Sequence, residues 1–170
     1  MSMLDISLIR RTRQHHALEH ATIHVLNMRF PALRLIGWSS SRGFYIHGPL
    51  STDQIRQGVA EALTRLRRGE THLAVHPRCG TNLVTSATLV GLVAFAAMLP
   101  GDKRSRRERL PTVLLLSTLA SLAAQPIGLL VQQYLTTEPR IASDLDAHVE
   151  QIHIGRIPVH RVQLVPRARG

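Results

Sequence analysis

The sequence runs LVTSATLVGLVAFAAML from Leu83 to Leu99 and VLLLSTLASLAAQPIGLLV from Val113 to Val131. Neither stretch contains a charged residue. Their lengths, about 17 and about 19 residues, approach or meet what an α-helix needs to cross the hydrocarbon core of a bilayer. We therefore predict a transmembrane hairpin at 82–134, with helices at about 83–99 and 112–134 and a basic loop at 101–111.

The alternative is a pair of buried helices in a soluble protein, because Ser, Thr, Gln and Pro residues make both stretches less apolar than strong membrane spans. However, a soluble domain within 170 residues is too small to surround two such helices on every side. Small residues also recur at helical spacing, as close packing in lipid requires, and they offer faces for a homo-oligomer. They are Ala87, Gly91, Ala120, Ala124 and Gly128.

The net charge is +10, and 20 of the 21 basic residues are arginine. Five basic residues stand in the loop between the two apolar stretches, with no aromatic platforms among them. This pattern favours anionic lipid headgroups as the partner and argues against nucleic acid. The basic loop would be expected in the cytoplasm, but the first 80 residues carry eleven arginines and residues 1–14 lack the apolar core of a signal peptide. We expect the soluble part in the cytoplasm.

The segment His16-Ala17-Leu18-Glu19-His20 has the pattern H-x-x-E-H of the inverzincin metalloproteases. Two histidines four residues apart share a helix face, so both rings can reach one metal ion. Glu19 can then act as a general base toward a metal-bound water. His24 extends the stripe, although a further histidine is more often solvated or packed than ligating, and we expect His15 to support the site or lie on the surface.

A second cluster, His76-Pro77-Arg78-Cys79-Gly80-Thr81-Asn82, contains the single cysteine. Its position ahead of a helix, beside Arg78 and His76, favours the thiolate, which is a zinc ligand. Thr81 or Asn82 is expected to cap the helix. The simpler interpretation is a tight turn in which Cys79 only packs. Together, the clusters predict a divalent metal site at His16, His20, His76 and Cys79, and the chemistry of these ligands favours zinc.

The remaining segments predict a small two-layer α/β domain interrupted by the hairpin, formed by residues 1–81 and 135–170. The first part contains a helix from Thr12 or Gln14 to about Met28 and a ββαβ segment, whose helix opens with a Ser51–Gln54 capping box. The second part contains one helix followed by strands. The predicted strands are 33–38, 43–47, 72–75, 152–154 and 159–165, and the C-terminal helix is 143–151.

Two motifs in this order resemble the YqhQ-like bacterial membrane proteins: His-x-x-Glu-His-x-Thr-Ile at His16–Ile23 and His-Pro-Arg-Cys-Gly-Thr at His76–Thr81. In those proteins the second motif enters a transmembrane helix, and the family is described as predicted metal-dependent enzymes of unknown function. The resemblance implies a shared metal site that also involves Glu19, and a multi-pass protein of the bacterial plasma membrane. It implies no substrate.

Three functions are compatible with these residues. The first is a zinc-dependent hydrolase at the membrane surface, with Glu19 as catalytic base and a membrane-proximal peptide or lipid headgroup as substrate. Inverzincins use a downstream glutamate as third ligand, and the candidates Glu61 and Glu70 lack the supporting local pattern. The second is a structural or regulatory protein with a closed His/Cys site. A cysteine enzyme using Cys79 with His76 is the third, although no Asn or Asp is placed to orient the histidine.

Overall fold

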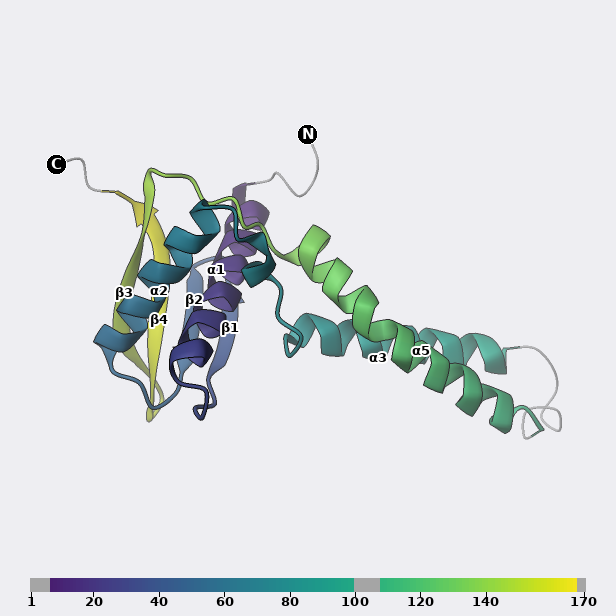
Figure 1. Ribbon diagram of the computed structural model, residues 1–170. Coiled ribbons are helices and arrows are strands. Elements are labelled where there is room, and N and C mark those ends of the chain that lie inside the picture. The colour runs from purple at the N-terminus through teal and green to yellow at the C-terminus, as the bar shows by residue number, and fades with distance from the viewer. Residues whose placement is uncertain (1–6, 100–107, 168–170) are drawn as a thin grey trace. The chain divides into compact units, whose positions relative to one another are not determined.

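The computed structural model describes residues 7–99 and 108–167, which form two compact units. The α/β unit comprises the described residues of 1–76 and 135–170, and the hairpin unit comprises those of 77–134 (Figure 1). Residues 101–107 of the predicted basic loop lie outside the described part of the chain.

The α/β unit contains a four-stranded antiparallel sheet in the order β1-β2-β4-β3. Its strands are β1 (Ile36–Ser40), β2 (Gly43–His47), β3 (Leu145–Ile154) and β4 (Ile157–Pro166). The two strands before the hairpin unit join the two after it where Phe44 of β2 pairs with Val162 of β4. The predicted α/β class is confirmed, and the sheet is completed only by the C-terminal part of the chain.

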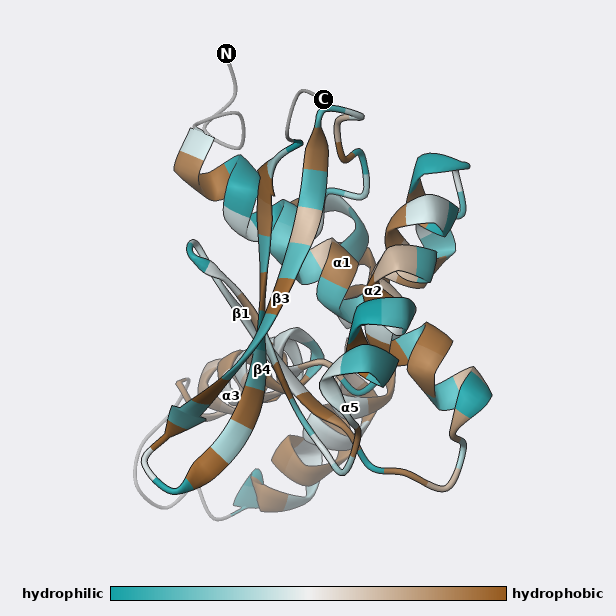
Figure 2. Ribbon diagram, turned by 90° about the vertical axis from the view of Figure 1, so that its left-hand side faces the viewer, coloured by the Kyte–Doolittle hydropathy of each residue, from teal (hydrophilic) through white to brown (hydrophobic). Residues whose placement is uncertain are grey.

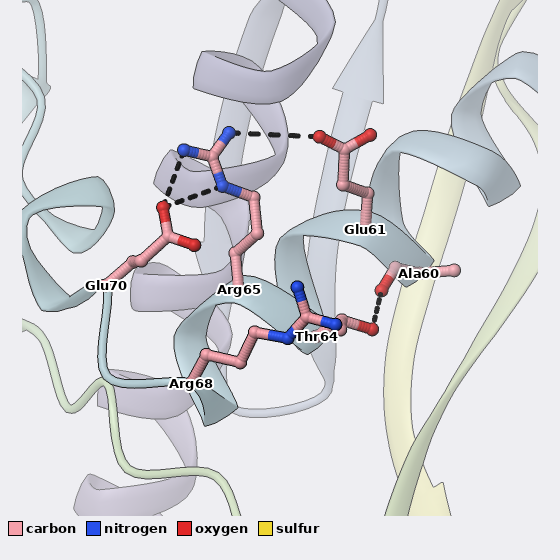
Figure 3. Close-up of a pocket in the computed structure, with 6 residues that line it drawn as sticks. All are labelled: Ala60, Glu61, Thr64, Arg65, Arg68 and Glu70. Carbon is pink, nitrogen blue, oxygen red and sulfur yellow. Dashed lines mark hydrogen bonds and ion pairs between the residues drawn. The ribbon is translucent and has the colours of Figure 1, made fainter.

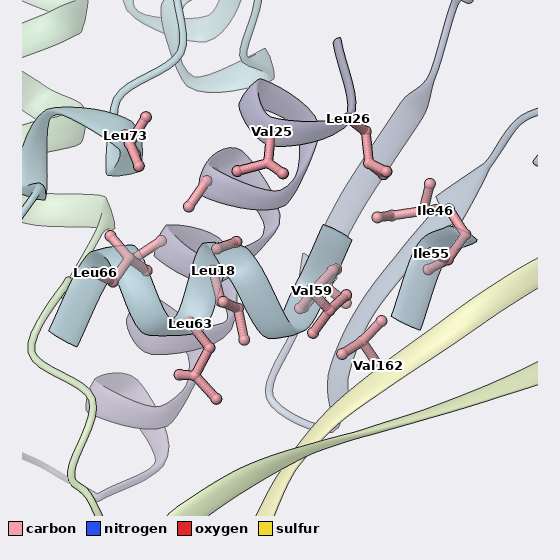
Figure 4. Close-up of a cluster of buried hydrophobic side chains, with 14 of the residues drawn as sticks. Leu18, Val25, Leu26, Ile46, Ile55, Val59, Leu63, Leu66, Leu73 and Val162 are labelled. Atoms are coloured by element: carbon pink, nitrogen blue, oxygen red, sulfur yellow. The ribbon is translucent and has the colours of Figure 1, made fainter. Parts of the chain in front are cut away.

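One face of this sheet is covered by two helices, α1 (Ser7–Arg29) and α2 (Thr52–Arg67) (Figure 2). Leu18 and Leu26 of α1 and Val59 of α2 are buried with apolar side chains of the central strands (Figure 4). The capping box at the start of α2 is present as predicted, because the Ser51 hydroxyl accepts from the Gln54 amide and the Gln54 side chain accepts from the Ser51 amide. The packing of Leu18 and Leu26 fixes α1, which carries the H-x-x-E-H motif, against the sheet.

Two predicted elements are wrong in type. Residues 72–75 do not form a strand but lie mostly in the 3₁₀ helix η2 (Thr71–Ala74), and the predicted helix 143–151 falls largely in strand β3. In β3, Leu145, Ala147 and Val149 alternate with more exposed polar residues, and this period of two matches a half-buried strand. Pairing with β4 over ten residue pairs therefore decides the conformation of this segment.

The hairpin unit consists of α3 (Gly80–Met98) and α5 (Leu110–Val131), followed by a π-helical turn, η3 (Gln132–Thr136), whose last two residues belong to the α/β unit. Both helices are long and apolar enough to cross a membrane. Ala120, Ala124 and Gly128 are buried on one face of α5. Gly128 lies so close to Asn82 of α3 that a Cβ there would clash with the Asn82 side chain.

A buried polar link also joins the two helices of the hairpin unit. The Gln132 side chain, which is fully buried, donates to Asn82 Oδ1 at 2.7 Å, and Asn82 Nδ2 donates to the Pro77 carbonyl at 2.8 Å. The link gives each of these two buried side-chain amides a hydrogen-bond partner. It therefore fixes the turn at Pro77 to the far end of α5.

Candidate metal centre

Four histidine rings of the α/β unit lie in a contiguous cluster. α1 places His16, His20 and His24 in one row, and His76 lies beside the last two. The ring centroids are 4.3 Å apart for His16 and His20, 5.7 Å for His20 and His76, and 5.0 Å for His24 and His76. We call these four residues the histidine cluster. It unites residues from both sequence motifs.

Backbone carbonyls set the orientation of the two histidines of the H-x-x-E-H motif. His16 Nδ1 lies 3.0 Å from the Thr136 carbonyl oxygen, and His20 Nδ1 lies 2.8 Å from that of Ala74. Because a carbonyl oxygen only accepts, we assign the ring proton to Nδ1 in both histidines. Nε2 then carries the lone pair that a metal ion needs. A ring N–H donated to a carbonyl is the usual support of a metal-binding histidine.

His24 uses its other ring nitrogen. Its Nε2 lies 2.9 Å from the Val75 carbonyl oxygen, so the proton is on Nε2 and the lone pair on Nδ1. The carbonyl groups of Ala74 and Val75 both accept hydrogen bonds from histidines of α1. The segment that leads to His76 is therefore held against the row of histidines on this helix.

Glu19 lies on the neighbouring face of α1, toward β1, and is only 5% exposed. The Ser39 hydroxyl of β1 donates to its carboxylate. Burial raises the pKa of Glu19 above its usual value, although the Ser39 hydrogen bond acts in the opposite direction. A carboxylate in such a setting holds a proton more readily than an exposed glutamate, as a general base requires.

Gly37 is a functional neighbour that the sequence did not reveal. It lies in β1 directly against Glu19, and a Cβ at this position would clash with the Glu19 carboxylate and with Ile23. Gly37 therefore allows the strand to approach the carboxylate closely. Glycine within a strand often marks such a close approach, and that was the available signal.

His15 is neither at the surface nor a member of the histidine cluster. It is buried in the α/β unit, where Nδ1 lies 3.0 Å from the Ser40 carbonyl oxygen and Nε2 accepts from the Leu164 amide at 3.4 Å. Burial lowers the pKa of His15. The expected supporting or surface role is thus corrected: the ring joins α1 to two strands as a neutral core residue.

The two glutamates considered as inverzincin-type ligands are held in ion pairs at an open surface depression (Figure 3). Arg65 binds Glu70 with two nitrogens, at 2.6 and 2.8 Å, and lies 3.8 Å from Glu61. Arg29 also binds Glu61. The hydrogen bond from Arg65 lowers the pKa of Glu70. These contacts give Glu61 a structural role on α2 and Glu70 a structural role just beyond its C-terminal end.

Cys79 belongs to the hairpin unit, where it is the N-cap of α3. Its Sγ accepts from the Thr81 amide at 3.4 Å. The expectation that Thr81 or Asn82 caps this helix is therefore wrong, and Asn82 instead donates to Pro77. An N-cap position favours the thiolate form of a cysteine, as the sequence suggested.

Residues 11–152, which include both motifs, match a domain of unknown function (DUF6391). The chain belongs to the DUF6391 family. It is also 36% identical over 163 residues to an uncharacterised protein of Picosynechococcus sp., covering 89% of this chain and 78% of that relative. No solved structure matches the chain. The prediction of a family of unknown function is thus confirmed. The family match does not identify this family as the YqhQ-like proteins.

Proposed function

We propose that this DUF6391 protein binds a divalent metal ion, zinc by the type of its ligands, with His16 and His20 as the first two ligands. The observation that carries the proposal is that Nδ1 of each ring lies within hydrogen-bond distance of a backbone carbonyl oxygen, from which we assign both rings the same tautomer. Each donates Nδ1–H to a backbone carbonyl, and the two Nε2 lone pairs belong to residues one helical turn apart. Four-residue spacing on a helix suits two imidazole ligands of one zinc ion.

His76 and Cys79 are the proposed remaining ligands. The His76 ring already lies beside that of His20. Cys79 follows His76 by three residues, so the chain keeps their Cα atoms within about 11 Å. Imidazole nitrogen and thiolate sulfur are the ligand types that structural and catalytic zinc sites share. The helix N-cap position adds support, because it favours the ionised thiol that a metal binds.

We further propose that the hairpin unit spans the bacterial plasma membrane twice, with the α/β unit in the cytoplasm. The length and composition of its two helices support this, as does the exposure of large apolar side chains along them. His76 is the last residue of the α/β unit before the hairpin unit begins. The proposed metal site then acts close to the membrane surface.

The reaction we propose is hydrolysis of a membrane-proximal substrate. The metal supplies Lewis acidity and lowers the pKa of water. Glu19 accepts a proton as the water oxygen bonds to the substrate carbonyl carbon, and that proton passes to the leaving group as the scissile bond breaks. The buried carboxylate, oriented by Ser39 and Gly37 on a residue between the two histidines, supports this role.

A closed structural site is the second candidate. Four protein ligands, His16, His20, His76 and Cys79, would leave no open position for water. The carbonyl bonds of His16 and His20 favour this alternative equally, because they reach residues near both ends of the hairpin unit. In this case the metal fastens the chain where it passes between units, and Glu19 only supports the site.

The deciding experiment measures metal content and hydrolysis of the full chain purified in detergent. We expect about one zinc per chain, and 10- to 100-fold weaker binding in His20→Ala through the loss of a ligand and its supporting bond. His153→Ala, which removes an exposed histidine of β3, is the matched control and should keep its metal. Equal metal content in the two variants would overturn the proposed site.

Glu19→Gln separates the two candidates. An enzyme should keep its metal but lose about 100-fold or more in turnover, the usual share of general-base catalysis. A closed site should instead lose metal affinity or stability and show no turnover in either form. The substrate probes are an unstructured peptide mixture and phospholipid vesicles, so that both proposed substrate classes are tested.

A further inference from the structure

β1 is an edge strand of the sheet and lies next to Glu19. Among the described residues it pairs with β2 alone, because the sheet order places β1 at one edge and β3 at the other. An edge strand presents unpaired backbone N–H and C=O groups along its outer side. Ser39 and Gly37 of this strand contact the Glu19 carboxylate. The unpaired edge thus belongs to the strand that contacts the proposed catalytic base on α1.

The histidine cluster lies on the adjoining side of α1. Successive helix residues are about 100° apart, so Glu19 is about 60° from His16 and about 100° from His20 around the axis. Ala17, which belongs to the buried core, is about 160° from Glu19 around the axis and so lies on the far side of the helix from the carboxylate. Around the helix the order is therefore Glu19, His16 and His20, with Glu19 against β1. A chain paired to the outer edge of β1 would run beside these groups.

We propose that an extended polypeptide adds to the sheet at β1 and presents its main chain to Glu19 and the histidine cluster. This rests on the proposed function and names its substrate class, an unfolded or extended peptide. Backbone pairing supplies affinity that depends little on sequence. The side chains of alternate residues would meet Trp38, which is 39% exposed and stacks on Tyr45 with centroids 5.2 Å apart. A lipid headgroup has no backbone amides to pair with this edge.

The test is hydrogen–deuterium exchange of the full-length Glu19→Gln variant, loaded with zinc in detergent and mixed with a random decapeptide mixture. Because this variant should turn the peptides over about 100-fold more slowly, bound peptide persists long enough to be measured. We expect slower exchange of the amides of Ile36–Ser40, by about threefold or more, when the peptides are added. The other edge strand, Leu145–Ile154, is the internal control and should not change.

A second mixture, in which alternate backbone nitrogens are methylated, keeps its side chains but loses half of its amide donors. It should give no protection of β1, and in the wild-type protein it should be cleaved at least tenfold more slowly. No protection at β1, equal protection of both edge strands, or equal effects of the two mixtures would overturn peptide addition. Failure of the proposed function is separate, since it appears as absence of bound zinc in the wild-type protein.

Discussion

Phenylalanine side chains lie in opposite environments in the two units. Phe44 of β2 is completely buried in the α/β unit, whereas Phe95 of α3 is 64% exposed in the hairpin unit. The α/β unit hides its apolar side chains between helices and sheet, as a protein in water must. The hairpin unit directs leucine and phenylalanine outward, which agrees with the proposal that it lies in a bilayer. The comparison teaches that exposure has a different meaning in each unit.

The largest expected effect comes from truncating these two phenylalanines. Phe44→Ala should lower the free energy of unfolding of the α/β unit by about 3–5 kcal/mol, because it removes a buried ring and leaves a cavity. Phe95→Ala should change it by less than about 0.5 kcal/mol, as for other substitutions outside a packed core. Urea unfolding in detergent, followed by the fluorescence of the single tryptophan, Trp38, measures this. Comparable losses in both variants would mean that Phe95 belongs to a packed core.

The next effect compares two leucines that are both 61% exposed, Leu92 of α3 and Leu8 of α1. Leu92→Arg should cost about 2.5–3.5 kcal/mol of membrane insertion if α3 spans the bilayer. Leu8→Arg should cost almost nothing, because its site faces water. Carbonate extraction of membranes gives the fraction retained for each variant. Full retention of both, or release of the unaltered protein, would contradict the membrane-spanning proposal.

The smallest effect is the pH dependence of stability. Burial lowers the pKa of His15, and also that of His160, below the ordinary histidine value of 6.5. The unfolded chain therefore binds protons first as pH falls, so stability is full above about pH 6.5 and is lost as pH falls toward the folded pKa values. Each tenfold difference in proton affinity between the folded and unfolded chain corresponds to about 1.4 kcal/mol.

The two units again differ, because α3 and α5 contain no ionisable side chains. Urea midpoints of the α/β unit, measured by Trp38 fluorescence at pH 7.5 and 5.5, should fall at the lower pH. Replacement of His15 by Gln should reduce that difference. A stability that rises on acidification would show that these histidines are not held neutral by the fold.

The sequence predicted the elements whose cause is local. The H-x-x-E-H helix follows from its helical spacing, and the Ser51 cap follows from two residues three apart. Residues 143–151 are predicted as a helix, but pairing with β4, which the local sequence does not reveal, makes most of them part of strand β3. The hydrogen-bond partners of the histidines could not be predicted from the sequence for the same reason. Carbonyls such as those of Thr136 and Ala74 carry no sequence signature, and only the tertiary fold brings them to α1.

The carbonyl bonds of α1 also have a mechanical consequence. The chain leaves the α/β unit after Val75 and returns near Thr136, and α1 holds both crossings, through His24 and through His16. Because both ends are held, the inserted segment is a closed loop. The entropic cost of closing such a loop grows only slowly with its length. If the hairpin unit spans a bilayer as proposed, tension along the chain would reach these ring N–H bonds before it reaches the core. The H-x-x-E-H helix thus holds the chain at both ends of the inserted segment.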